Sequence, residues 1–434
     1  MLELLQQVRL LDPGSHTDRI ADVLVEAGTI RTIADVITEY PADTTIHDGR
    51  GQILAPGLVD LYSRSGEPGC EARETLASLA QAAAAGGFTR VAILPNTLPA
   101  MDNSASIAWF GEQVAGNRQQ AADQTSSHLP LSLAPTPQLR PWAALTLEVK
   151  GQQMTELAEL AATEAVGFAD GKPIANLLLV RRLLEYLRPI AKPILLWACD
   201  PELTGNGVMR EGQDAIVFGL PGIPSIAETT ALAALLECVA ETGTPVHFMR
   251  ISTARSVDLI RTAKERGLPI TASTTWLHLL HNTTHIRAYD PNLKLNPPLG
   301  TPTDQQALIH AVQTGILDAI AIDHTPYTYE EKTVAFAEAP NGAIGLELAL
   351  PLLWQTLVAT QQWTALELWT ALSTRPAQCL HQSPPTLASG NPADMLLFDP
   401  QLAWRVEPRS LKSRSTNTAW LGQEIQGRIL KIWC

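Results

Sequence analysis

Histidines are the side chains in this sequence best suited to metal-dependent chemistry, because a neutral imidazole offers a lone pair to a divalent cation. Ten histidines are spread over the 434 residues, and only one group has a regular spacing: His278 and His281 are three apart, and His285 follows after four. On a helix this spacing would place three imidazoles on one face, and residues 276–282 favour a helix. Residues 281–284 are typical of a turn, so we expect exposed histidines rather than a metal site.

Composition excludes several functional classes. The formal net charge of −13 and the lack of a basic run argue against binding to nucleic acid. The five cysteines are widely spread and form no CxxC pair that would indicate zinc or redox chemistry. The N-terminal residues do not resemble a signal peptide, and no apolar run approaches the length of a membrane span. We therefore expect a cytoplasmic globular protein.

The elements that must position any functional residue follow a repeated pattern of helix and strand. Alanine-rich residues 75–85 predict a helix that ends at a Gly-Gly pair, and the apolar run 88–94 predicts a buried strand. Similar helix–strand units lie at 178–198, 227–251, 256–273 and 304–323. This alternation predicts a parallel sheet, closed into a (β/α)₈ barrel or open and doubly wound. No glycine-rich dinucleotide fingerprint supports the open form, and in a barrel the residues that follow each strand carry the chemistry.

The two ends of the chain have a different residue pattern, with short apolar runs separated by turn residues. Residues 20–25 and 30–37 read as short strands separated by Ala27-Gly28, and near the other end the runs 419–425 and 428–433 flank an expected turn at Gly427. We expect both ends to form one small β domain. The predicted division is 1–54 and 385–434 for this domain and 55–384 for the barrel.

Several blocks of the sequence resemble the dihydroorotase family of the amidohydrolase superfamily, and they occur in the order of that family over nearly the whole chain. The most specific are Ala55-Pro56-Gly57-Leu58-Val59-Asp60, Tyr289-Asp290-Pro291-Asn292-Leu293-Lys294, Asn296-Pro297-Pro298-Leu299, Asp323-His324-Thr325-Pro326 and Asn391-Pro392-Ala393-Asp394. The resemblance implies an α/β fold with a TIM-type (β/α)₈ barrel and a small β-sandwich domain built from both chain ends. It also implies a place in pyrimidine biosynthesis, where the family interconverts dihydroorotate and N-carbamoyl-aspartate with the help of zinc.

The positions that correspond to the metal-ligand histidines of the family hold other residues. The His-x-His at the end of the first barrel strand is replaced by Tyr62 and Arg64, and the next two ligands are replaced by Trp197 and Arg250. A guanidinium has no lone pair to give and repels a dication. We therefore predict no metal and no other cofactor, and an indole at Trp197 large enough to plug the former site.

Other family positions are also altered. The arginine that would grip the substrate carboxylate falls at Gly66, Tyr327 replaces a second histidine, and Gly300 stands where arginine is frequent. The acidic-Gly segment that would supply a bridging ligand is one residue short. Asp170 or Lys172 could be its relic, although we expect a solvated turn there.

Three positions that match functional residues survive. The resemblance implies substrate contacts for Asn96 and Asn296 and the proton-transferring role for Asp323. Asn96 beside Pro95 is equally typical of a turn. A general base alone adds only about 10²–10⁴-fold and does not replace zinc, so we expect Asp323 to be a vestigial catalytic position, paired with Arg250 or Arg64.

These features favour a pseudoenzyme that acts as a scaffold or regulatory subunit. The resemblance implies aspartate carbamoyltransferase as a partner, or self-association into an oligomer. An alternative is an active dihydroorotase, or another cyclic amidohydrolase, with unorthodox or absent metal ligands. A third interpretation treats Arg64 and Arg250 as a site for a small anionic ligand.

Overall fold

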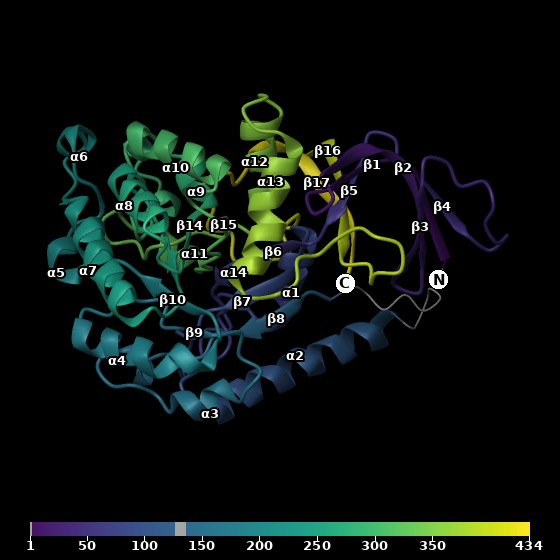
Figure 1. Cartoon of the computed structure of the whole chain (residues 1–434). Coiled ribbons are helices and arrows are strands. Elements are labelled where there is room, and N and C mark those ends of the chain that lie inside the picture. The colour runs from purple at the N-terminus through teal and green to yellow at the C-terminus, as the bar shows by residue number, and fades with distance from the viewer. Residues whose placement is uncertain (1, 126–135) are drawn as a thin grey trace.

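A ring of parallel strands forms the centre of the computed structural model, which describes residues 2–125 and 136–434 (Figure 1). One parallel sheet contains β6, β7 and β8, and a second has the order β15-β14-β13-β10-β9. A bridge from Ala143 to Phe168 connects β8 with β9. On the other side, Asp323 N donates to Tyr62 O at 3.0 Å and Arg64 N donates to His324 O at 2.8 Å. These bonds close eight strands into a barrel.

The barrel strands are short. Their bounds are β6 Leu58–Ser63, β7 Phe88–Ile93, β8 Gln138–Pro141, β9 Phe168–Ala169, β10 Ile194–Trp197, β13 Val246–Met249, β14 Ile270–Thr275 and β15 Ala319–Ala321. A separate parallel pair consists of β11 Met209–Arg210 and β12 Gly222–Ile223. The strand positions expected from the apolar runs are confirmed with differences of one or two residues at their ends.

Helices surround the barrel, and consecutive ones pack together: α4 on α7, α7 on α8 and α8 on α10 (Figure 1). The long helices are α1 Leu76–Ala85, α2 Ser104–Thr125, α4 Leu177–Leu187, α7 Ile226–Thr242, α8 Ala254–Glu265 and α10 Pro302–Thr314. The shorter ones are α3 Leu157–Ala161, α5 Pro201–Thr204, α6 Gln213–Phe218, α9 Trp276–Leu280, α11 Tyr329–Lys332, α12 Ala349–Leu353, α13 Ala365–Trp369 and α14 Arg375–Cys379.

Threonine caps fix where several of these helices begin. The side chains of Thr75, Thr253 and Thr301 accept hydrogen bonds from the backbone at the starts of α1, α8 and α10. Such a cap satisfies an amide that has no partner within the helix, and it is worth about 1 kcal/mol. Each cap follows a strand or loop of the barrel, so the chain leaves the barrel at a defined residue. The residues at the strand ends can then contribute their side chains to a site.

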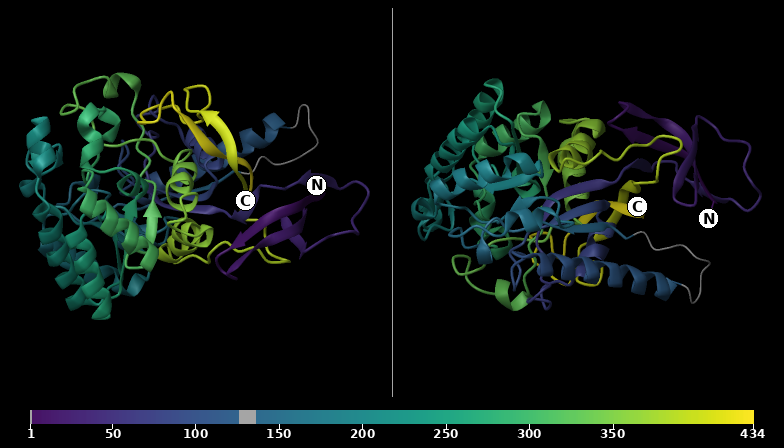
Figure 2. Two further views of the ribbon diagram at one scale, coloured as in Figure 1. Left: turned by 90° about the horizontal axis from the view of Figure 1, so that it is seen from above. Right: turned by 60° about the horizontal axis from the view of Figure 1, so that its bottom comes forward.

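The two chain ends share one sheet with the order β17-β16-β5-β1-β2-β3, and β4 pairs with β1. Figures 1 and 2 show the purple strands of the N-terminal segment at the same end of the molecule as the yellow C-terminal strands. The strands are β1 Leu2–Asp12, β2 Thr17–Glu26, β3 Thr29–Ala34, β4 Thr45–Asp48, β5 Ile53–Pro56, β16 Met395–Arg405 and β17 Glu424–Trp433. The expectation that both ends form one β-sheet is confirmed, whereas the boundaries at 54/55 and 384/385 stay a prediction.

The turn expected at Gly427 is wrong. Residues 424–433 form one continuous strand that pairs antiparallel with β16, and the register shifts between the pairs Asp399–Arg428 and Ala403–Gln426. Gly427 lies at this irregularity with φ +99°, and a Cβ there would come within 2.9 Å of the Phe398 ring. Glycine is therefore needed for a bulge inside the strand.

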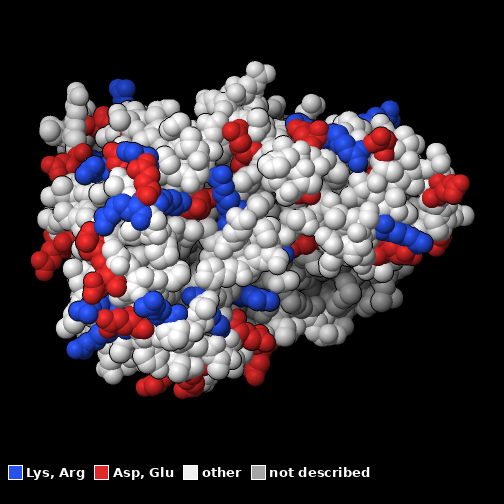
Figure 3. All heavy atoms as spheres, in the orientation of Figure 1, with Lys and Arg blue, Asp and Glu red and all other residues white. Residues whose placement is uncertain are grey.

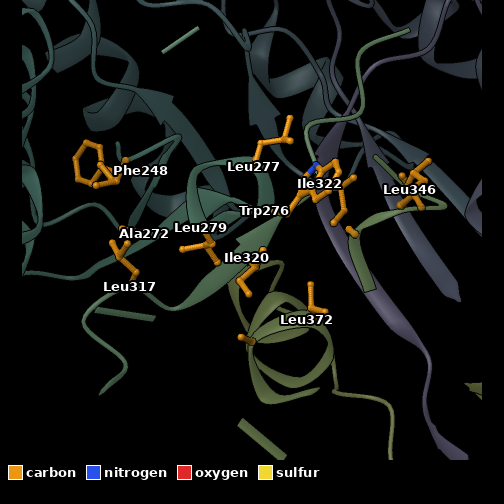
Figure 4. Packing of buried hydrophobic residues seen from close by; sticks show 14 of the residues in the cluster. Phe248, Ala272, Trp276, Leu277, Leu279, Leu317, Ile320, Ile322, Leu346 and Leu372 are labelled. Atoms are coloured by element: carbon orange, nitrogen blue, oxygen red, sulfur yellow. The ribbon is translucent and has the colours of Figure 1, made fainter. Parts of the chain in front are cut away.

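Buried side chains join the barrel to its helices. Figure 4 shows Trp276 of α9 beside Ile322, which follows β15, and Leu346 lies on the other side of that residue. The surface in Figure 3 intersperses basic with acidic groups over the face shown. None of the described helices combines the length and the apolar character needed to cross a membrane.

Candidate active-site remnant

The side chains at the replaced positions meet at the carboxyl ends of the barrel strands. Tyr62 lies at the end of β6, Trp197 is the last residue of β10 and Arg250 directly follows β13. Asp323 follows β15 and Arg64 follows β6, where these two strands close the barrel. The structure thus brings together residues that are far apart in the sequence, at the edge where barrel enzymes carry out chemistry.

Arg250 and Asp323 form a two-pronged ion pair. Arg250 Nε donates to Asp323 Oδ2 at 2.7 Å and Nη2 donates to Oδ1 at 2.6 Å, while Nη1 donates to Gly171 O at 3.1 Å. The Arg250 side chain is only 1% exposed and that of Asp323 is 16% exposed. Burial lowers the pKa of Arg250, but the charge of Asp323 and its hydrogen bonds outweigh burial and raise it overall. The predicted pairing of Asp323 is confirmed, with Arg250 as the partner.

Both members of this pair have a left-handed backbone. Arg250 has φ +59° and Asp323 has φ +51°. Such a conformation costs a non-glycine residue about 1–3 kcal/mol and persists only where surrounding contacts enforce it. Strain of this kind clusters at functional sites, and here it falls at two facing strand ends.

Tyr62 and Trp197 occupy the interior next to this pair. The Tyr62 hydroxyl lies 3.1 Å from Ser273 Oγ and accepts a hydrogen bond from Arg250 N at 3.1 Å. The Arg250 guanidinium carbon lies 4.7 Å from the centroid of the Trp197 ring, a distance at which a cation and an aromatic face attract each other. The indole of Trp197 therefore stabilises the positive charge of Arg250. The same charge would repel a metal ion at this place.

The plug expected from Trp197 is incomplete. A cavity of about 150 Å³ remains, and it is lined by Arg64, Trp197, Arg250, His278, Asn296 and Asp323 among others. A smaller hollow of about 80 Å³ lies next to it and is lined by Arg64, Arg73, Asn96 and Tyr327 among others. Arg64 borders both spaces, with Asn296 in one and Asn96 in the other. The substrate-contacting roles of the two asparagines stay predictions.

The expectation of a solvated turn at the acidic-Gly segment is wrong for Asp170. Asp170 is buried rather than solvated, and it accepts hydrogen bonds from Leu145 N at 2.8 Å and Thr146 N at 3.0 Å. Burial raises the pKa of Asp170 to about 6 in spite of these bonds. Lys172 is exposed, as expected. Asp170 therefore braces the loop after β8.

The expected exposure of the spaced histidines holds only for His285. His278 is buried at the cavity, and His281 is largely buried with its ring stacked on Trp420 at 4.9 Å. His278 follows the strand β14 at a distance of only three residues. Functional residues of a barrel follow its strands, so the position of His278 just after β14 was the signal that could have placed it at the site. The helical spacing of the three histidines suggested a surface position instead. His128 lies outside the described residues.

Hydrogen bonds fix the tautomer of His278. Its Nε2 lies 3.3 Å from Pro298 O, and since a carbonyl only accepts, Nε2 carries the proton. Nδ1 lies 2.7 Å from Thr275 Oγ1 and accepts from that hydroxyl. Both ring nitrogens are engaged, so His278 has no free lone pair for a metal or a proton transfer.

The residues at the four replaced positions do not fit zinc. Tyr62 is buried, which raises its pKa and keeps the phenol protonated. An indole N–H and two guanidiniums only donate. Across residues 2–125 and 136–434, no group of three or more His, Cys, Asp or Glu side chains is arranged to hold an ion. The nearby His324 is engaged with Glu74, at 3.3 Å, and accepts from Gly345 N.

Comparison with known proteins decides the family. The family model described as "Dihydro-orotase-like" matches residues 51–256. A dihydroorotase of Pelobacter propionicus is 38% identical to the chain, and the match covers 98% of the chain and 96% of that protein. The chain belongs to the dihydroorotase family. A protein of Synechocystis sp. named "Probable dihydroorotase-like protein" is 44% identical over 98% of both chains.

Solved structures support the fold of this dihydroorotase-family chain. An L-hydantoinase from Arthrobacter aurescens matches with a TM-score of 0.80 at 19% identity, and it covers 99% of this chain and 93% of its own. A dihydropyrimidinase from Brevibacillus agri matches with a TM-score of 0.81 at 19% identity. The predicted fold class, a TIM-type barrel with a smaller β-sandwich, is confirmed.

Changing His278 is expected to alter stability in a pH-dependent way. Burial lowers the pKa of His278 from 6.5 to about 4, so below about pH 6.5 the unfolded chain binds a proton that the folded chain does not. The stability that depends on a neutral His278 is therefore lost as pH falls. The cost of His278→Gln should be about 2 kcal/mol smaller near pH 5 than near pH 8.

Urea unfolding of the wild type and the variant at both pH values measures this difference. Buried Asp60 and Glu347 have raised pKa values and act in the opposite direction on the wild-type curve. They are common to both proteins and cancel in the comparison. An equal cost of His278→Gln at the two pH values would contradict a neutral, buried imidazole. His310→Gln is the matched control at an exposed position of α10 and should leave the free energy of unfolding nearly unchanged at both pH values.

Proposed function

We propose that this chain is a dihydroorotase-family protein of pyrimidine biosynthesis that does not catalyse the family reaction and serves as a scaffold or regulatory subunit. The observation that carries the proposal is the ion pair between Arg250 and Asp323, at 2.6 and 2.7 Å, in the place of a metal centre. A cation fills the position of the ligand, and the carboxylate that would transfer the proton is bound to it.

The chemistry of amide hydrolysis explains why this arrangement is inactive. In metal-dependent enzymes zinc polarises the carbonyl and lowers the pKa of its bound water to about 7, which generates hydroxide at neutral pH. The residues at the four replaced positions offer no ligand set for zinc. Asp323 would have to break two charge-assisted hydrogen bonds with Arg250 before it could accept a proton.

The proposed role as a scaffold is supported by what is kept. The barrel is closed and both chain ends join one sheet, so the family fold is present although the residues at its centre differ. We propose aspartate carbamoyltransferase as the partner, with self-association as the second way of forming an oligomer, and we place the protein in the cytoplasm.

A second candidate is an active cyclic amidohydrolase with unorthodox ligands. The observation in its favour is that the cavity still contains His278, Asn296 and Asp323 together. Against it, both nitrogens of His278 are engaged and Asp323 is paired. We therefore favour the inactive function.

An assay of dihydroorotate hydrolysis tests the proposal, with purified tag-free protein and zinc in excess. We expect no turnover above the buffer rate. Light scattering of the chain mixed with the aspartate carbamoyltransferase of the same organism tests the role as a subunit. A complex of defined mass is expected, and turnover at an enzymatic rate would overturn the proposal. Two separate proteins in the mixture would remove the partner and leave self-association.

A further inference from the structure

Another cavity lies at the opposite end of the barrel from the ion pair. It has a volume of about 290 Å³, and its lining includes Ile194, Val246 and Ile270, the first residues of β10, β13 and β14. Arg250 follows the other end of β13, and a strand of four residues spans about 13 Å. The cavity shares no lining residue with the one beside Arg64. It is therefore a separate space at the amino ends of the barrel strands.

Proline rings form part of the rim of this cavity. Pro193, Pro245 and Pro269 each stand directly before one of these three strands, and all three line the cavity. A proline has a fixed φ and no N–H to donate, so this rim is rigid and apolar. Proline surfaces also pack well against aromatic rings.

The surroundings of the cavity supply no counter-charge to a ligand. Among the residues that line it, none is Lys, Arg, Asp or Glu. The charged groups that act on the thiol of Cys379 in the wall are Asp318, Lys264 and Arg375. Lys264 and Asp318 pair with each other at 2.7 Å, and Arg375 donates to Val312 O at 3.1 Å. A charged ligand would therefore lose its hydration without gaining a partner.

Two buried polar side chains also stand in the wall. His247 is 4% exposed and Cys379 is 7% exposed. Burial lowers the pKa of His247 to about 3 and raises the pKa of Cys379 to about 12, so both are uncharged at neutral pH. His247 Nδ1 lies 2.8 Å from Thr271 Oγ1, and the Thr271 hydroxyl also hydrogen-bonds to the Cys379 thiol.

The direction of these hydrogen bonds is set from the other end of the barrel. Arg250 N donates to the Tyr62 hydroxyl oxygen at 3.1 Å, so the Tyr62 O–H has Ser273 Oγ as its acceptor, also at 3.1 Å. The Ser273 O–H then donates to His247 Nε2, which lies 2.8 Å away. Nε2 of His247 is therefore unprotonated, and Nδ1 carries the proton.

This order leaves one weak donor for the cavity. His247 Nδ1 donates to Thr271 Oγ1, the Thr271 O–H donates to Cys379 Sγ, and the Cys379 S–H remains to face the cavity. A thiol donates only weakly, but sulfur makes favourable contacts with aromatic rings. The wall therefore suits an aromatic ring better than a polar group.

We propose that this cavity binds a small, uncharged molecule with two fused aromatic rings. The proline rim and the Cys379 thiol favour an aromatic body, and the lack of a counter-charge disfavours an ion. An engineered cavity of about 150 Å³ lined by apolar side chains binds benzene, whereas the volume here is about 290 Å³. Two fused rings therefore fill the cavity better than one ring does.

Calorimetric titration of the full chain at pH 7 tests this proposal with 2-naphthol, an uncharged molecule of two fused aromatic rings. Decahydro-2-naphthol has the same skeleton without aromatic rings, and phenol has only one ring. We expect one 2-naphthol to bind per chain, and the other two probes to bind at least tenfold more weakly. No binding of 2-naphthol, or equal binding of either other probe, would overturn the proposal.

Variants assign the binding to this cavity. Cys379→Phe places a ring of the protein in the cavity and should weaken 2-naphthol binding at least tenfold. Cys434→Phe adds the same ring at an exposed position and should leave the affinity unchanged. Unchanged affinity in Cys379→Phe would overturn the assignment. If that variant does not fold, Gln378→Trp at the exposed rim of the cavity replaces it, with the same expectation and the same contrary result.

Charged relatives of the probe test the uncharged wall. Neither 2-naphthoate nor 2-naphthylmethylammonium should show binding that Cys379→Phe abolishes, and such binding would contradict a preference for an uncharged ligand. These measurements concern the end of the barrel opposite the ion pair, and they need neither zinc nor turnover. Their failure would therefore leave the proposed function standing.

Discussion

Replacing Asp323 with alanine is expected to destabilise the protein by about 3–5 kcal/mol, because it leaves the Arg250 guanidinium buried without a counter-ion. The Arg250 side chain is 1% exposed and depends on Asp323 for its counter-charge. In an active relative the same change would chiefly affect catalysis. Here it should appear as a lower urea midpoint in equilibrium unfolding followed by circular dichroism.

Two further proteins make this measurement specific. The double variant Asp323→Leu with Arg250→Met replaces the whole pair by apolar groups and should recover much of the loss. Arg181→Ala breaks an exposed pair with Glu185, at 3.0 Å, and should cost under about 1 kcal/mol. A loss for Asp323→Ala no larger than that for Arg181→Ala would show that the central ion pair does not stabilise the fold.

Restoring the four histidines is expected to create a zinc site. In the variant with Tyr62→His, Arg64→His, Trp197→His and Arg250→His, Asp323 loses its guanidinium partner and becomes available beside four imidazoles. The present side chains already converge: the Arg250 guanidinium carbon lies 4.7 Å from the Trp197 ring centroid and 5.6 Å from that of Tyr62. We expect about one zinc ion per chain in elemental analysis, since imidazole and carboxylate are good zinc ligands.

The matched control keeps Arg250 and changes only the other three positions. Its guanidinium still holds Asp323 and repels a dication, so this variant should retain little zinc after gel filtration. Equal zinc content in the triple and quadruple variants would mean that Arg250 does not exclude the metal. Circular dichroism and the unfolding midpoint establish that both variants are folded.

The architecture could be predicted because it depends on patterns that many residues share. The helices α1, α4, α7, α8 and α10 and the strands that follow them were visible as alternating runs with glycine or threonine at their ends. A fold specified in this distributed way survives the replacement of a few central residues. For the same reason, likeness in sequence establishes the family without establishing the activity.

The site was predicted only where chemistry constrained it. A carboxylate at a barrel strand end without a metal must find a cation, which led from Asp323 to Arg250 or Arg64, and the structure pairs it with Arg250. Burial was harder to predict, because Asp170 and His278 each look like a solvated residue in local sequence and become buried only when distant segments pack on them. The bulge at Gly427 depends on Phe398 of the neighbouring strand, so the sequence around Gly427 does not predict it.

The volume of the remaining cavity could not be deduced from the sequence either. A tryptophan is large enough to fill the space of two ions, but its fit depends on the direction of its ring. Trp197 turns its face toward Arg250 at 4.7 Å, and a space of about 150 Å³ stays open beside Arg64. The residues at the replaced positions therefore leave an open cavity beside Arg64 at the barrel mouth.

Zinc content is the most direct test of the central claim that this barrel has exchanged its metal centre for an ion pair. Tag-free wild-type protein would be incubated with excess zinc, passed through gel filtration and analysed for zinc per chain, and the same sample would be assayed with dihydroorotate. We expect well under one zinc per chain and no turnover. Stoichiometric zinc together with turnover would contradict the account and would require ligands other than those at the four replaced positions.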